Sequence, residues 1–329
     1  MKFSARSFLL LSVGALLFQS AETKSLPVTK KPFTILWSEM QWYYKTASQA
    51  VEKCSNNSDQ YTSHWESSTK EISDMLLGDV NQNFLRHKTV IHNMVRTNPE
   101  RDTVENSHLS SCISKDQQKL FRDINNAADK DPYFWFPVNR AGMQYYASKV
   151  NQLINIQKKS ITITEIGGGF GDLCRTFKEI NPDATYIIFD LPEMLAMQYL
   201  YLSSMVDSPV IFHTKLPRPE DLTASAIHLV PSVFMNEMTN FKTDVFVSTF
   251  ALSETSEEVQ QFVIDQAFFN AKCVYIVGQI DGWKGIGMDW IVDHSLLLDA
   301  IHSSFKLVIT NPYHYFDVKM QSYEALARK

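Results

Sequence analysis

The apolar residues of the chain follow two periodicities. From residue 160 onward, short runs rich in Ile, Val, Phe and Tyr are too brief for a helix and predict buried strands. The clearest of these runs are 161–166, 186–190, 244–250 and 273–277. The runs 210–213 and 227–230 are also typical of strands, and the sequence leaves open which of them is the third core strand.

Segments with helical spacing separate these strands. Apolar residues recur at helical positions in 172–180, 192–205 and 256–271. Pro192 stands in the first turn of the second segment, and Ser256 and Glu257 suit the N-terminus of the third. This alternation predicts an α/β fold, a doubly wound and mostly parallel sheet with helices on both faces.

The first part of the chain shows helical spacing only. Apolar residues recur at such positions in 33–53, 64–77, 85–95 and 115–124. We therefore expect a helical N-terminal region over 30–130, appended to an α/β domain over 131–329. Prolines flank an aromatic connector at 131–137, and a helix over 139–156 leads into the first strand.

A cluster of glycines follows the first strand. Of the 11 glycines in the chain, four lie within five positions, at 167, 168, 169 and 171. Glycine lets the backbone turn sharply and approach a ligand closely. The second strand then ends in Asp190, where a nucleotide-binding βαβ unit presents a carboxylate to ribose hydroxyls. The simpler alternatives are a tight turn for the glycines and a helix cap for Asp190.

The spacing of the glycines distinguishes between nucleotides. The dinucleotide pattern G-x-G-x-x-G, started at Gly167, requires a glycine where the chain has Asp172. The chain has instead an acidic residue, Glu165, followed by glycines at alternate positions. This pattern resembles motif I of the class I S-adenosylmethionine-dependent methyltransferases.

The resemblance implies a Rossmann-like sheet of the seven-stranded type, closed by an antiparallel pair at 305–310 and 315–320. It also implies S-adenosylmethionine as cofactor. The residues expected to bind it are Glu165, Gly167, Gly168, Gly169, Gly171, Asp190 and Leu191.

Three further segments narrow the resemblance. Leu191-Pro-Glu follows Asp190, Ser253-Glu254 follows the strand at 244–250, and Asp281 follows the strand at 273–277. Together these segments look like those of the sugar O-methyltransferase family over about residues 130 to 290. The resemblance implies transfer of a methyl group to a hydroxyl of a sugar or glycan.

A sugar hydroxyl is a weak acid, so a general base helps its methylation. Such a base belongs at the carboxyl ends of the strands, where open α/β sheets bind ligands. Glu254 is the first candidate and Asp281 the second. His213 is the third, on condition that 210–212 is the core strand. The alternatives are a helix-dipole role for Glu254 and a turn role for Asp281.

A metal ion is a further option for the resembled class. The carboxylates that could hold Mg²⁺ are Glu254, Asp281 and Asp289, but their spacing in the sequence fixes no site. The histidines are scattered along the chain, and His87 and His92 are not a helical i, i+4 pair. We therefore expect no required zinc.

The N-terminus resembles a targeting segment. Lys2 and Arg6 precede an apolar run at 8–18, and small residues follow it up to Ala21. The run is shorter than the roughly 20 residues of a membrane span, so a cleaved signal peptide over 1–21 is favoured over an anchor formed by 8–18. We expect the secretory pathway, either the ER or Golgi lumen or the exterior, with membrane contact only if the segment stays uncleaved.

Cysteine and asparagine positions agree with that route. A bridge between Cys54 and Cys112 is plausible in a secreted protein, and Asn56 heads a glycosylation sequon. Cys174 and Cys273 are expected to be buried thiols. The formal net charge of −5 argues against nucleic acid as a partner and leaves a small molecule or glycan.

Two alternatives to an active methyltransferase remain open from the sequence. The first is a secreted or lumenal protein that keeps the fold without catalysis, because the methyl donor is made in the cytosol. The second is an NAD(P)-dependent enzyme, which Asp172 disfavours.

Overall fold

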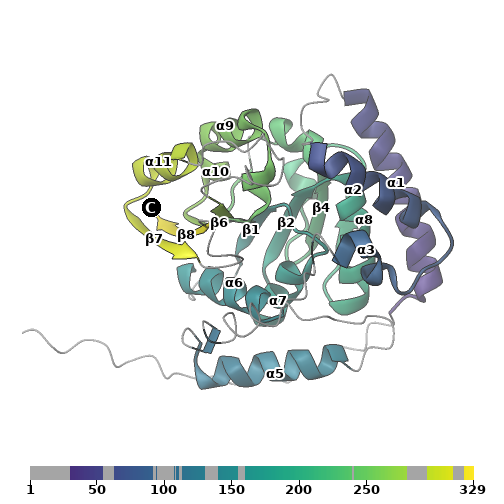
Figure 1. Ribbon diagram of the computed structural model, residues 1–329, viewed down its shortest axis with the longest axis horizontal. Coiled ribbons are helices and arrows are strands. Elements are labelled where there is room, and N and C mark those ends of the chain that lie inside the picture. The colour runs from purple at the N-terminus through teal and green to yellow at the C-terminus, as the bar shows by residue number, and fades with distance from the viewer. Residues whose placement is uncertain are drawn as a thin grey trace, which may run out of the picture.

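A computed structural model of the chain describes residues 30–54, 63–91, 94, 107, 109–110, 113–129, 140–154, 160–238, 241–279, 295–313 and 322–329 (Figure 1). Within these residues, no helix combines the length and the apolar character that crossing a bilayer requires.

A single eight-stranded sheet organises the molecule. Its strand order is β3-β4-β2-β1-β5-β6-β8-β7. The strands are β1 (Thr162–Ile166), β2 (Thr185–Asp190), β3 (Val210–Phe212), β4 (Ile227–Pro231), β5 (Val245–Thr249), β6 (Cys273–Gln279), β7 (Leu307–Tyr313) and β8 (Ser322–Arg328). The strands from β1 to β6 pair in parallel, and β8 pairs antiparallel with β6 and β7. The predicted α/β fold with a mostly parallel sheet is confirmed.

The order of the strands decides which one is the third core strand. β4 pairs with β2 along its whole length and places Pro231 opposite Asp190. β3 pairs only with β4 and forms the edge of the sheet. The core strand is therefore 227–231, and 210–212 is an additional strand outside it.

The antiparallel pair lies later in the sequence than expected. β7 covers 307–313, close to the predicted 305–310, but its partner β8 covers 322–328. The predicted partner, 315–320, falls outside the described residues. The sequence of β8 does not alternate between apolar and polar residues in the usual way, because Ser322 and Glu324 are buried together with the apolar residues of this interior strand.

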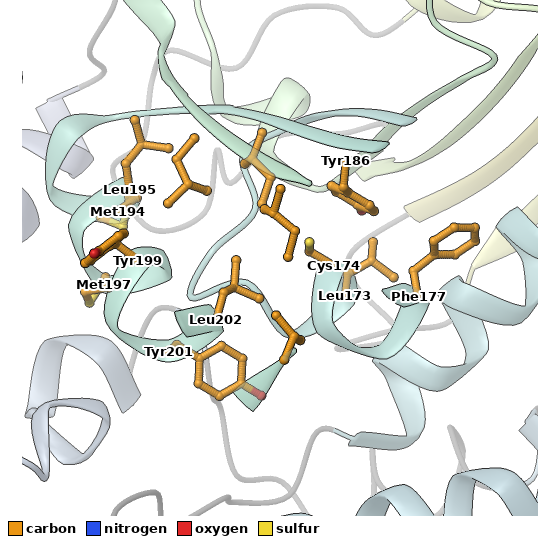
Figure 2. Close-up of a cluster of buried hydrophobic side chains, with 14 of the residues drawn as sticks. Leu173, Cys174, Phe177, Tyr186, Met194, Leu195, Met197, Tyr199, Tyr201 and Leu202 are labelled. Atoms are coloured by element: carbon orange, nitrogen blue, oxygen red, sulfur yellow. The ribbon is translucent and has the colours of Figure 1, made fainter. Parts of the chain in front are cut away.

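Helices cover both faces of the sheet, as expected. α7 (Asp172–Ile180) and α8 (Pro192–Met205) have the predicted bounds, and α6 (Arg140–Leu153) precedes β1. Together with α1 (Phe33–Cys54) and α2 (Ser63–Leu77) they share one core cluster with β1 and β2. In Figure 2, side chains of α7 such as Cys174 lie beside Tyr186 of β2, and those of α8 form the other side of the same cluster.

The opposite face is covered by α9 (Glu257–Asp265), α10 (Ala267–Asn270) and α11 (Ser295–Ser304). The single helix predicted over 256–271 is wrong, because residues 267–270 have left-handed φ angles of 49–57°. This turn places Phe268 and Phe269, exposed by 0% and 2%, in the core of that face. Tertiary packing thus overrides the helical pattern at the end of the segment.

The N-terminal helices lie against the sheet domain. Figure 1 shows α1 and α2 beside α8, and the predicted helices at 33–53 and 64–77 are confirmed. α5 (Lys115–Asp129) extends the predicted helix at 115–124. The start of the predicted helix at 85–95 is instead divided into η2 (Phe84–Arg86) and α3 (Lys88–Val90), because His87 has an extended backbone with ψ 135°. Residues 92, 93 and 95 lie outside the described residues.

Candidate functional site

The glycine turn connects β1 to α7 at the carboxyl end of the sheet. Gly167, Gly169 and Gly171 have φ angles of 74°, 56° and 99°, a region that L side chains rarely adopt. The Gly167 N–H donates to the Phe189 carbonyl at 2.9 Å, and the Gly171 N–H donates to the Gly168 carbonyl at 2.8 Å. The turn is therefore fixed against β2 by its own backbone.

The glycines differ in what lies beside them. A Cβ on Gly167 would fall 1.9 Å from the Ala251 Cβ, and one on Gly168 would fall 2.9 Å from Ile188 Cγ2. A Cβ on Gly169 would meet nothing within 4 Å. The protein itself fills the space beside Gly167 and Gly168, whereas Gly169 leaves its backbone open to a ligand.

Asp190 joins the end of β2 to this turn. Its Oδ2 accepts the Gly168 N–H at 2.9 Å and the Gln198 amide at 2.7 Å, and its Oδ1 accepts the Leu191 N–H at 2.8 Å. A carboxylate offers about four lone-pair positions. Three are in use, so one remains for a further donor such as a ribose hydroxyl.

Leu191 contributes through its backbone. It is the N-cap residue of α8, with an extended conformation, and it is half-buried. Its N–H holds Asp190 Oδ1, while Pro192 begins the helix. This arrangement directs the Asp190 side chain back toward the glycine turn.

Glu165 lies beneath the turn and has almost no contact with solvent, with 1% of its surface exposed. The Tyr186 hydroxyl donates to its Oε2 at 3.0 Å. Burial raises the pKa of Glu165 to about 8, with a further rise from the charge of Asp190. Burial also raises the pKa of Asp190 to about 7, against the three hydrogen bonds that lower it.

Asp172 occupies the third glycine position of the dinucleotide pattern. Its Oδ1 accepts Arg175 Nε at 2.8 Å and the Tyr201 hydroxyl at 2.7 Å, and both Asp172 and Arg175 are buried. This carboxylate holds the first turn of α7 against α8. It occupies the place where the third glycine of the dinucleotide pattern would let the helix pack closely against the strand.

Glu254 lies at the same edge of the sheet. It ends η6 (Ala251–Glu254), which directly follows β5 and Phe250, and it is half-buried. Ser248 fixes this turn, because its Oγ donates to the Ile166 carbonyl at 3.2 Å and accepts the Leu252 N–H at 3.0 Å. Since Ala251 also faces Gly167, η6 lies directly against the glycine turn.

The helix-dipole alternative for Glu254 is weakened by this geometry. α9 begins at Glu257, and the acidic residues of its first turn are Glu257 and Glu258. Glu254 therefore precedes the helix and belongs to a separate turn.

His213 does not meet its condition for a catalytic base. It follows the edge strand β3 and not the core strand β4. Its Nε2 lies 3.0 Å from His228 Nδ1, and His228 Nε2 lies 2.9 Å from the Thr223 carbonyl. Burial lowers the pKa of His213 to about 4, with a smaller contribution from His228. The pair joins β3 to β4.

Several predicted groups cannot be placed. Asp281, Asp289, Cys112, Asn56 and the targeting segment lie outside the described residues. Cys174 and Cys273 are buried free thiols, as expected. In the part of the chain that the structure describes, no three His, Cys, Asp or Glu side chains are grouped so that they could hold a metal ion.

Sequence reasoning missed Gln198 and Tyr186, which contact Asp190 and Glu165. Gln198 stands two helical turns beyond Asp190 within the apolar run 194–202 of α8. A single amide in such a run is a signal that could have identified it, because buried polar groups require partners. Tyr186 is indistinguishable from any other aromatic strand residue until the tertiary structure is known.

No family model and no curated protein matches the chain. Among solved structures, it is similar to human N-acetylserotonin methyltransferase, with 10% identity and a TM-score of 0.35 over 65% of this chain and 56% of that one. It is also similar to phosphoethanolamine N-methyltransferase 2 of Haemonchus contortus, with 10% identity and a TM-score of 0.40 over 56% of this chain and 52% of that one. An O-methyltransferase family protein of Burkholderia thailandensis gives 11% identity and a TM-score of 0.38 over 65% and 63%.

The chain thus spans less than two thirds of the length of each of these proteins. The TM-scores are low, so the fold is assigned from the order and direction of the strands in the chain itself.

Proposed function

We propose that the protein transfers a methyl group from S-adenosylmethionine to a hydroxyl of a sugar or glycan. One observation carries the proposal. The Gly168 N–H donates to Asp190 Oδ2 at 2.9 Å, which joins a glycine turn and an acidic strand end at the carboxyl edge of adjacent parallel strands. The sugar acceptor is supported only by the resemblance of the segments around Leu191, Ser253 and Asp281.

The residues of this edge fit the cofactor. Gly169 has open space beside it, so a ligand can approach the backbone there. Asp190 keeps one lone-pair position for a ribose hydroxyl, whereas Glu165 is buried beneath the turn against Tyr186 and supports it from below. When bound, S-adenosylmethionine supplies an activated methyl group on a sulfonium ion.

Glu254 is the best-placed base among the described residues. It lies in the turn next to the glycines, where it can accept the proton of an acceptor hydroxyl. Beyond this base, the protein contributes by orienting the acceptor hydroxyl toward the methyl group. Asp281 stays a second candidate.

The donor is tested by ligand binding to the full chain. We expect S-adenosylhomocysteine to raise the temperature of thermal unfolding, and NAD and NADP to leave it unchanged. Replacing Asp190 with Asn removes the negative charge and turns one of the two acceptor oxygens into a donor, so it should abolish the shift. Asp221→Asn, on the surface turn after β3, is the matched control and should keep it. A shift with NAD instead, or with none of the ligands, contradicts the proposal.

The acceptor is tested by measuring how fast S-adenosylmethionine is converted into S-adenosylhomocysteine in the presence of monosaccharides and glycans. Glu254→Gln should lower kcat by roughly 10²- to 10⁴-fold, the usual contribution of a general base. Glu257→Gln, exposed in the first turn of α9, is the control and should retain the wild-type rate. Equal rates for the two variants would remove Glu254 from the mechanism.

We also propose that residues 1–21 direct the chain into the secretory pathway. The support is the apolar run at 8–18 behind two basic residues, together with the sequon at Asn56. Mass spectrometry of the protein from expressing eukaryotic cells should find a mature N-terminus near residue 22 and a glycan at Asn56. An intact N-terminus on a cytosolic, unglycosylated chain contradicts this location.

A further inference from the structure

Gln198 is a completely buried amide on α8, with an exposed fraction of 0%. Its neighbours along the helix, among them Met197 and Tyr199, belong to the apolar core drawn in Figure 2. Its Nε2 donates to Asp190 Oδ2 at 2.7 Å and to the Gly169 carbonyl at 2.9 Å. One side chain therefore bonds both the acidic end of β2 and the open glycine of the turn.

The orientation of this amide is determined by its partners. Both the Gly169 carbonyl and the Asp190 carboxylate are hydrogen-bond acceptors, so only the NH₂ end of the amide can face them. Each of its two protons serves one partner. Neither a methionine nor a glutamate of the same length could provide both donors.

Gln198 also affects the charge of Asp190. The other donors to this carboxylate are the backbone groups of Gly168 and Leu191, so Gln198 is the one that a substitution can remove. The acidic group that opposes the ionisation of Asp190 is Glu193, on the first turn of α8, whereas the Gln198 hydrogen bond favours it. The charge of Asp190 in turn raises the pKa of Glu165, which lies beneath the turn.

We propose that Gln198 is a positioning residue for the cofactor. It directs the Asp190 carboxyl group at the ribose, and it holds the Gly169 backbone at the separation from Asp190 that the nucleoside requires. This inference rests on the proposed function, because it deepens the account of the same site.

The test compares Gln198→Met with Gln260→Met in the full chain. Gln260 is a fair control, because it is also buried, with 1% of its surface exposed, and its amide also donates to two acceptors, the carbonyls of Leu252 and Thr255. Its amide donates to η6 and the residue after it, and not to Asp190 or to a glycine of the turn.

Isothermal titration with S-adenosylhomocysteine is measured over a series of pH values. Gln198→Met should bind roughly 10- to 100-fold more weakly, the effect of losing one hydrogen bond to a charged group. The pH above which binding strengthens should also rise, because Asp190 is then harder to ionise. Gln260→Met should leave both the Kd and this pH unchanged, even if it unfolds at a lower temperature. A wild-type Kd and pH profile for Gln198→Met would overturn the inference.

A second measurement keeps the inference testable if Gln198→Met does not fold or if the wild type binds no S-adenosylhomocysteine. In the ¹⁵N- and ¹³C-labelled wild-type chain, the side-chain amide of Gln198 should shift at the pH at which the Asp190 carboxyl titrates, with Asp190→Asn identifying the signal. A Gln198 amide signal whose chemical shift does not follow the titration of the Asp190 carboxyl refutes the role of Gln198. If the Gln198 signal follows the titration of Asp190 and the chain still binds no cofactor, the proposed function alone is refuted.

Discussion

At the scale of single residues, the glycine turn separates positions required by the fold from a position open to a ligand. A side chain at Gly167 would collide with Ala251, whereas one at Gly169 would enter empty space. The two glycines share a left-handed backbone, so the strain of an L residue is similar at both. Only the surroundings differ.

Gly169→Ala should therefore stay folded and lose affinity for S-adenosylhomocysteine, because its methyl group occupies the approach to the backbone. The strain should lower the free energy of unfolding by only about 1–2 kcal/mol. Gly167→Ala should fail to fold or unfold at a much lower temperature, because the 1.9 Å contact with Ala251 cannot be relieved by a flexible side chain. Thermal unfolding and titration calorimetry of the two variants check this. Full affinity in Gly169→Ala would contradict a ligand at that position.

The two buried carboxyls make the stability of the ligand-free protein depend on pH. The pKa of Glu165 is raised from 4.5 to about 8 and that of Asp190 from 3.8 to about 7, so the folded state keeps protons that the unfolded state has lost. Their contribution is complete below the unfolded pKa values and is lost as pH rises through the folded ones.

We therefore expect the free energy of unfolding of the wild type to fall between about pH 5 and pH 8 relative to that of Glu165→Gln. The glutamine is neutral at every pH and still accepts the Tyr186 hydroxyl. Urea denaturation at intervals across this range measures the difference. Parallel curves for the two proteins would show that Glu165 does not titrate there.

The sequence identifies those residues whose role depends on local backbone. A glycine turn after a strand and an acid at the next strand end are both encoded by neighbours in the chain. Gln198 and Tyr186 act through contacts 8 and 21 residues away in sequence, which depend on how α8 and β2 pack. Pattern alone does not contain that information.

At the scale of elements, α8 is tied at its start and middle to α1 and at its end to Lys30, which precedes α1. Tyr44 lies 3.0 Å from Glu193 Oε1, Tyr199 donates to Glu39 Oε2 at 2.7 Å, and Lys30 donates to the Ser204 carbonyl at 2.7 Å. α8 begins two residues after Asp190 and also provides Gln198. The N-terminal helix therefore supports the element that forms the ribose side of the site.

Tyr44→Phe removes the first of these ties. Burial raises the pKa of Glu193, and its carboxyl would lose the Tyr44 donor, so we expect the free energy of unfolding to fall by roughly 1–3 kcal/mol. Thr46→Ala, whose hydroxyl bonds only within the exposed part of α1, should change it far less. Chemical denaturation of both variants measures the difference. Equal small changes would show that the Tyr44 contact does not stabilise the fold.

The boundaries of helices and strands could be predicted where a local sequence signal is strong. The prediction failed where tertiary packing determines the boundary. α7 and α8 start at the positions that Gly171 and Pro192 indicate. The segment 256–271 has helical spacing, yet its last residues turn left-handed to bury Phe268 and Phe269. The sequence also could not rank the strand-like runs at 210 and 227, because both are apolar and only pairing with β2 separates them.

At the scale of the whole molecule, the N-terminal helices and the sheet share one core. Tyr43 of α1 stacks on Phe212 of β3 at 5.4 Å and meets Tyr199 of α8 edge-on at 5.1 Å. Trp37 and Met40, exposed by 1% and 0%, lie in the same cluster as β1 and β2. Removing the helices would expose this apolar face.

A chain of residues 140–329 should therefore be insoluble or fail to unfold cooperatively, whereas residues 30–329 should give one cooperative transition. Circular dichroism and analytical ultracentrifugation of the two chains check this. A soluble, folded 140–329 would show that the sheet domain is independent of the helices that cover it.

The position of β8 has a consequence for synthesis on the ribosome. β8 lies between β6 and β7, although it follows both in the chain. While residues 273–313 have emerged and 322–328 have not, β6 has an open edge and β7 has no neighbouring strand to pair with. Unpaired edges of this kind invite association between nascent chains. Completion of the sheet must wait until 322–328 emerge, so the interval before then is when the chain most needs a chaperone.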